Sequence, residues 1–118
     1  IDARITSDGS DGIQEIIIFC FDWILLNSNK TRQGFMYHDS LLIANVENRQ
    51  KEILFTLSNQ LCINNNKQYI ININYDQILG FEDEVKKLIN QKTILTLTDK
   101  SAKEKLLGIE VDLGPEIK

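Results

Sequence analysis

The sequence contains no apolar run long enough to cross a lipid bilayer, and it begins with no cleavable signal peptide. These absences predict a cytoplasmic protein without membrane contact. The net charge of −4 does not favour a broad attraction to nucleic acid or anionic membranes. The two cysteines, Cys20 and Cys62, lie among apolar residues, and no Cys/His cluster has zinc spacing. A disulfide between them is one interpretation, and reduced buried thiols are the favoured one.

What the chain does contain is ordinary for a globular protein. It has 118 residues, of which 42% are hydrophobic and 25% are charged. This size suits one compact domain over residues 1–118. Because the first residue is Ile1 rather than Met, we expect the sequence to be a fragment or a processed form of a longer protein.

The stretch over residues 34–50 organises the chain. A short, mostly apolar run over residues 35–38 ends abruptly at Asp39, and a polar turn and an amphipathic segment follow. A buried parallel strand that delivers one carboxylate to the carboxyl edge of a sheet has this pattern. Such edges bind ligands in open α/β sheets. A carboxylate there is well placed to hold Mg²⁺ and its phosphates.

The clearest helix is predicted over residues 46–63, where apolar residues recur at helical spacing. The asparagines at 64–66 are expected to end it, because Asn tolerates the left-handed conformation of a helix C-cap. A second strand is predicted over residues 69–74. The strand, helix and strand with short connections predict a βαβ unit of parallel strands.

The amino-terminal part allows two interpretations. Residues 16–21 are β-branched and aromatic, which is typical of a buried strand, but the length of residues 13–29 favours a mostly buried helix. Before it, residues 6–12 are rich in turn formers. They form either a simple loop with Ser10 as a helix cap, or a phosphate-contacting turn at a helix N-terminus.

The carboxyl-terminal part predicts a second amphipathic helix over residues 81–91 and two strands over 93–98 and 106–113. The connection between these strands is too short for a parallel crossover, so they should form an antiparallel pair at one sheet edge. The Lys-rich link between them is expected to be a solvated hairpin tip. The fold class is therefore α/β.

Several segments taken together resemble a known family. They are Asp-Gly-Ser-Asp-Gly-Ile at 8–13, Ile-Phe-Cys-Phe-Asp at 18–22, Gly-Phe and His-Asp-Ser within 34–40, Glu-Asn-Arg-Gln at 47–50, and Leu-Thr-Asp and Leu-Gly-Ile within 97–109. The chain resembles the C-terminal domain of unknown function of bacterial YydD-like proteins. Those proteins look like SMC/RecN-type ABC ATPases with long coiled coils.

The resemblance implies a partial P-loop NTPase, namely the C-terminal lobe of a split ATPase head. Asp39 takes the position of the Walker B acid, which holds Mg²⁺ through water. Ser10 and Gly12 stand where a degenerate signature turn would touch the ATP γ-phosphate across a dimer of heads. Glu47 takes the D-loop acid position, and Asn74 takes the position of the switch histidine. The helical interpretation of residues 13–29 also rests on this resemblance.

The sequence departs from this family pattern at two places. Ser40 stands where ABC ATPases carry a catalytic Glu, and a serine cannot act as that base. His38 or Glu47 would have to substitute, or hydrolysis is slow. The chain also lacks a Walker A loop. A missing N-terminal lobe would supply it, so the isolated chain should not hydrolyse ATP.

Each candidate residue also has a plain structural interpretation. His38 is then a hydrogen-bonded structural residue, Asp39 a cap at the end of a strand, Glu47 a helix cap, and Asn74 a turn residue. At the level of the whole protein, the alternatives to a coiled-coil ATPase acting on nucleic acid or in defence are a non-hydrolysing scaffold gated by nucleotide and a small stand-alone α/β protein. The stand-alone protein needs a second acid near Asp39, for which Asp76 is the only candidate.

Overall fold

The computed structural model describes residues 12–28 and 30–108 of the chain. Helices and strands are mixed, so the α/β class is confirmed at that level. The chain divides into two compact units, Ile1–Lys87 and Leu88–Lys118, which are described separately below. The single domain over 1–118 stays a prediction. Among the described residues, no helix combines the length and the apolar character needed to cross a membrane.

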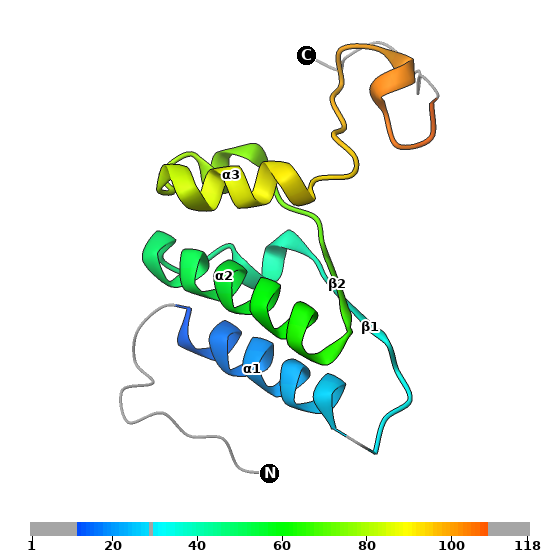
Figure 1. The fold of residues 1–118 in the computed structure, drawn as a ribbon. Coiled ribbons are helices and arrows are strands. Elements are labelled where there is room, and N and C mark those ends of the chain that lie inside the picture. Colours follow the sequence, from blue (N-terminus) through cyan, green and yellow to red (C-terminus); the bar gives the residue numbers. More distant parts are fainter. Residues whose placement is uncertain (1–11, 29, 109–118) are drawn as a thin grey trace, which may run out of the picture. The chain divides into compact units, whose positions relative to one another are not determined.

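The first unit is built on the predicted βαβ arrangement (Figure 1). Strand β1 (Phe35–His38) leads through a short 3₁₀ turn to helix α2 (Asn48–Asn65), which returns the chain to strand β2 (Gln68–Ile71). The two strands pair in parallel, with Phe35 opposite Gln68 and His38 opposite Ile71. The parallel pairing is confirmed and β1 has the predicted bounds, whereas β2 is shorter than the predicted range of 69–74 and residues 72–74 form no strand. The sheet has these two strands in the part of the chain that the structure describes.

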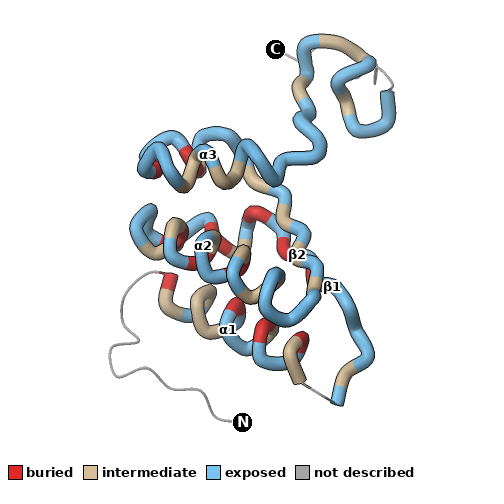
Figure 2. The backbone as a smooth tube through the Cα atoms, viewed as in Figure 1, coloured by how far each residue is buried: buried red, intermediate tan, exposed pale blue. Residues whose placement is uncertain are grey.

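Helices α1 (Ile13–Asn27) and α2 cover one face of this sheet. Along β1, buried residues alternate with exposed ones, because successive side chains of a strand point to opposite faces (Figure 2). Met36 and His38 are buried towards the helices, whereas Phe35 and Tyr37 lie on the opposite, open face and are exposed. The core of the unit therefore lies between the helices and one side of the sheet.

Helix α1 confirms the helical interpretation of residues 13–29, with its end at Asn27. Phe19, Trp23 and Leu26 form its buried stripe, at the spacing of one helix face. The helix begins after Gly12, whose φ of 89° is left-handed and suits glycine. The Thr31 hydroxyl donates a hydrogen bond to the Leu25 carbonyl at the other end, over 3.0 Å. Gly12 and Thr31 thus define the two ends of α1, and its buried stripe packs the helix against the core.

Helix α2 buries Lys51, Leu54 and Ser58, and it begins and ends two residues later than the predicted range of 46–63, within the asparagine run expected to end it. Its C-cap is Asn66, with φ 50° and ψ 48°, and the Lys67 N–H donates to the Cys62 carbonyl over 3.2 Å. Asparagine adopts this conformation more readily than other residues except glycine. The asparagine run therefore ends the helix one turn before β2 begins.

The predicted strand over residues 93–98 is wrong. These residues follow helix α3 (Asp83–Lys92) and form no strand, and Ile94 is 96% exposed. A strand requires a hydrogen-bonded neighbour, and the described residues provide none for this segment. One backbone bond, from Thr98 N–H to the Glu104 carbonyl, closes a turn instead. The other predicted strand, over 106–113, lies largely outside the described residues, and residues 106–108 form no strand.

Candidate functional site

Asp39 lies at the carboxyl end of β1, as the sequence predicts. Its extended backbone makes it the N-cap of the 3₁₀ turn η1 (Ser40–Ile43). One carboxylate oxygen, Oδ1, accepts a hydrogen bond from the Leu41 N–H over 3.0 Å. The side chain is exposed. Asp39 therefore caps a turn and presents its carboxylate to solvent at the same time.

The second carboxylate oxygen of Asp39 is bound by a residue that the sequence prediction missed. Asn72 follows β2, and the pairing of His38 with Ile71 brings Asn72 level with Asp39. The Asn72 amide Nδ2 donates to Asp39 Oδ2 over 3.1 Å. The Tyr37 hydroxyl in turn donates to Asn72 Oδ1 over 2.5 Å. The strand register was the signal that would have identified Asn72.

These contacts favour the ionised form of a carboxyl group that is already exposed to solvent. The Leu41 backbone N–H, and after it the Asn72 amide, lower the pKa of Asp39 below its ordinary value. Both groups donate to the ionised form and so favour it. Asp39 is therefore a carboxylate at neutral pH, which is the form that binds a divalent cation.

The turns that follow the two strands are joined to each other. Gln77 lies in the 3₁₀ turn η2 (Tyr75–Ile78), and its Nε2 donates to the Ser40 carbonyl over 3.2 Å. The same side chain accepts from the Asn74 N–H through Oε1 over 2.9 Å. Asn74, the predicted switch residue, is the N-cap of this turn. Ser40 is only 7% exposed.

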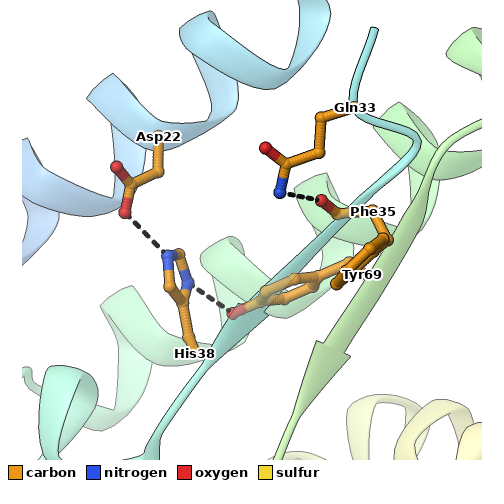
Figure 3. Close-up of polar contacts among 5 residues, drawn as sticks. All are labelled: Asp22, Gln33, Phe35, His38 and Tyr69. Carbon is orange, nitrogen blue, oxygen red and sulfur yellow. Dashed lines mark hydrogen bonds and ion pairs between the residues drawn. The ribbon is translucent and has the colours of Figure 1, made fainter.

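His38, which is 8% exposed, belongs to a different network that is partly buried (Figure 3). Its Nε2 lies 2.9 Å from Asp22 Oδ2 on α1, and its Nδ1 lies 3.1 Å from the Tyr69 hydroxyl on β2. Phe19 packs against the ring, with centroids 5.6 Å apart. Burial, with smaller contributions from Cys62 and Asp22, raises the pKa of Tyr69. Both ring nitrogens of His38 are thus engaged inside the unit, and Asp22 and Tyr69 were missed because only folding brings them together.

Gly12 lies against the segment that precedes Glu47. A Cβ on Gly12 would be 2.7 Å from the Asn45 carbonyl oxygen and 3.0 Å from the Val46 Cα, so only glycine fits this approach. Glu47 is exposed and takes the N-cap position of α2. Ser10 lies outside the described residues. The start of α1 and the start of α2 are therefore neighbours.

The donor set at the sheet edge fits a magnesium ion that brings its own phosphates. Within residues 12–28 and 30–108, no cluster of three or more His, Cys, Asp and Glu side chains could enclose a metal. Mg²⁺ in phosphate-binding sites commonly takes one or two carboxylates, with phosphate and water oxygens completing its octahedron. Asp39 would be the single carboxylate of such a site, because each of its oxygens keeps a further lone pair beside the hydrogen bond it accepts.

Comparison with known proteins places the chain in a family. Residues 1–111 match the model of a family described as an uncharacterised protein conserved in bacteria (DUF2326). The match covers most of the chain, so the chain belongs to this family. The prediction of a bacterial domain of unknown function is thereby confirmed. No curated protein and no solved structure matches the chain.

Proposed function

We propose that this member of the DUF2326 family is the C-terminal half of an SMC/RecN-like ABC ATPase head. In this proposal Asp39 is the Walker B acid and Glu47 the D-loop acid. Ser10 and Gly12 belong to a degenerate signature turn, and Asn74 stands in the switch position. ATP and Mg²⁺ bind where an N-terminal Walker A lobe of the same parent protein completes the site.

The observation that carries the proposal is the position of Asp39. It is an ionised, exposed carboxylate at the carboxyl end of a parallel strand, fixed on both oxygens. Ligands of open α/β sheets bind outside the carboxyl ends of the strands. The chain contributes one acidic ligand there and no phosphate loop. In a nucleotide site built from two lobes, this is what the C-terminal lobe is expected to contribute.

The open face of the sheet supports a second lobe. Phe35 is 51% exposed, Tyr37 54% and Ile70 38%, and all three lie on the face that α1 and α2 leave uncovered. Parallel sheets are found almost only with both faces covered, and a sheet of two strands is marginal alone. An N-terminal lobe that adds strands and covers this face would remove both deficits.

The placement of the signature turn and the homodimer of heads are proposed from the resemblance alone. Gly12 itself is buried against Asn45 and Val46 of this chain, which puts the start of α1 beside Glu47. An action of the whole machine on nucleic acid rests on analogy between folds alone.

Two observations favour a second candidate function, a non-hydrolysing lobe that serves as a nucleotide-gated scaffold or dimerisation module. Ser40, at the position of the catalytic Glu, is buried and carries no basic group. The ring nitrogens of His38 are both engaged by Asp22 and Tyr69. His38 and Glu47 are the two residues that could replace the missing base. Of these, Glu47 is exposed and His38 is buried.

The test is ATP hydrolysis by the complete parent protein, as wild type and as Asp39→Asn. Exposed Asp99 in the second unit provides Asp99→Asn as a control for the lost charge. Hydrolysis that disappears only in Asp39→Asn supports the ATPase. Absent hydrolysis with Mg²⁺-dependent ATP binding supports the scaffold. Neither binding nor hydrolysis by the wild type contradicts both. The isolated chain should show no turnover.

A further inference from the structure

The Tyr37 and Asn72 side chains form a support for Asp39 that crosses the sheet. Tyr37 stands on β1 just before the buried His38, and Asn72 follows β2. The hydroxyl of Tyr37 bonds Asn72 Oδ1 at 2.5 Å, and Asn72 Nδ2 bonds Asp39 Oδ2 at 3.1 Å. All three side chains are exposed, so this arrangement contributes little to the core.

We propose that Asn72 is a positioning residue for the Asp39 carboxylate, and that Tyr37 holds the Asn72 amide in the orientation this requires. What Asp39 then holds, a Mg²⁺ ion and its ATP phosphates, rests on the function proposed above. The positioning itself is a property of the hydrogen bonds and is testable without nucleotide.

The direction of the amide explains why two residues are needed. A side-chain amide offers an oxygen on one side and two N–H donors on the other, and a reversed amide would turn its oxygen towards the Asp39 carboxylate. The Asp39 carboxylate can only accept, so it requires the orientation in which the N–H side of the amide faces it. The Tyr37 hydroxyl, which can donate or accept, then donates to Oδ1 and anchors the amide in that orientation. Tyr37 acts on Asp39 only through Asn72.

The exposure of Asp39 explains why positioning matters. A solvated carboxylate held by the Leu41 N–H alone can turn about that single bond. The Asn72 bond fixes the second oxygen and thereby the plane of the group. Outer hydrogen-bond partners of metal-binding side chains typically contribute about 10- to 100-fold to metal affinity or activity. A preset carboxylate loses less conformational freedom when Mg²⁺ binds.

The experiment compares ATP affinity with and without Mg²⁺ in the complete parent protein. For Asn72→Ala we expect the affinity gained from Mg²⁺ to fall about tenfold, while ATP binding without Mg²⁺ is unchanged. For Tyr37→Phe we expect about a threefold fall, because one net hydrogen bond is lost at a distance. The matched controls are Asn64→Ala at the exposed end of α2 and Tyr75→Phe in η2, which should both behave as wild type.

A merely structural role predicts a different result. Asn72→Ala would then weaken ATP binding equally with and without Mg²⁺, or change neither, and either outcome overturns the proposal. Asn72→Leu, a side chain of similar size, removes both amide hydrogen bonds and adds neither a charge nor a metal ligand. It should lose the Mg²⁺ effect about as fully as Asn72→Ala, and wild-type Mg²⁺ dependence in it would also overturn the proposal.

A crystal structure of Asn72→Ala separates this inference from the proposed function. If the wild type binds no ATP, the proposed function fails, but the position of the Asp39 carboxylate still decides the inference. An Asp39 side chain that has turned away, with the Leu41 bond as its remaining anchor, supports positioning by Asn72. An Asp39 carboxylate in its wild-type orientation contradicts it.

Discussion

Two chains of hydrogen-bonded side chains start from adjacent residues of β1 and have different roles. The buried chain consists of Asp22, His38 and Tyr69, and the exposed chain consists of Tyr37, Asn72 and Asp39. The first ties α1 to both strands at the border of the core, with His38 buried and the Asp22 side chain 35% exposed. The second lies on the solvent side and ends in a carboxylate. Because successive side chains of a strand point to opposite faces of the sheet, Tyr37 and His38 take part in different networks although they are neighbours in sequence.

The difference between the chains is one of environment. A hydrogen bond in the core is expensive to break, because its partner is left without water, whereas an exposed partner finds water at once. The buried chain therefore contributes stability and specificity of packing. The exposed chain contributes little stability, and its carboxylate stays available to a ligand. His38, although it is the only histidine and adjoins Asp39, belongs to the stabilising part.

The largest effect on the free energy of unfolding should come from Phe19, which packs against the buried chain. Phe19 is 2% exposed and contacts the rings of Trp23, His38 and Tyr69. Phe19→Ala should lower the free energy of unfolding by about 3–5 kcal/mol, because it leaves a cavity in the core. Denaturant unfolding followed by Trp23 fluorescence measures this loss.

The control for Phe19→Ala is Phe35→Ala on the open face of β1. Phe35 is exposed, so its removal should cost less than about 1 kcal/mol. Both variants are measured in the isolated chain, which lacks the N-terminal lobe proposed to cover the open face, and equal losses there would contradict the comparison between the two faces.

Removing one hydroxyl from each chain should give a smaller but more specific difference. Tyr69→Phe leaves Nδ1 of the buried His38 without its partner, which should cost about 1–3 kcal/mol. Tyr37→Phe should cost about 0.5 kcal/mol or less, because the exposed Asn72 amide then binds water. The two unfolding curves, measured side by side, test this. A larger loss in Tyr37→Phe would reverse the assignment of roles.

Alkaline pH should destabilise the protein through Tyr69 of the buried chain. Burial raises the pKa of Tyr69, so the folded protein retains this proton where the unfolded chain, with an ordinary tyrosine pKa near 10, loses it. The stabilisation is complete below that pH and is lost as pH rises above it. Phenolate absorbance should show one tyrosine that ionises together with unfolding. Tyr69→Phe should remove that step, and a step that persists would contradict the assignment.

The smallest effect on stability should come from Asn72→Asp. Replacing the amide donor with a second carboxylate sets two like charges together, which raises the pKa of Asp39. The unfolding midpoint at neutral pH should barely move, because both groups are exposed. The carboxyl carbon of Asp39, followed by NMR through an acid titration, gives the shift directly. An Asp39 pKa equal to that of the wild type would show that Asn72 does not act on it.

Much of the first unit was predictable from the sequence because its patterns are local. The short apolar run before Asp39 predicted β1 with its bounds, and the asparagines indicated the end of α2 to within two residues. The parallel pairing followed from the order of strand, helix and strand. In each case neighbouring residues carry the signal.

The remaining features depend on partners that are distant in the chain. Residues 93–98 have the composition of a strand, but a strand exists only where a neighbour binds its backbone. Asn72 lies 33 residues from Asp39, and Asp22 lies 16 residues from His38. No local pattern marks them. The register of β1 against β2 identifies Asn72 as soon as the pairing is known.

The most direct test of the account is a calorimetric titration of the complete parent protein with ATP, with and without Mg²⁺, as wild type and as Asp39→Asn. The account predicts that Mg²⁺ strengthens ATP binding by the wild type and that Asp39→Asn loses this gain while it still binds ATP without the ion. An undiminished Mg²⁺ effect in Asp39→Asn would show that Asp39 is no more than the cap of a turn.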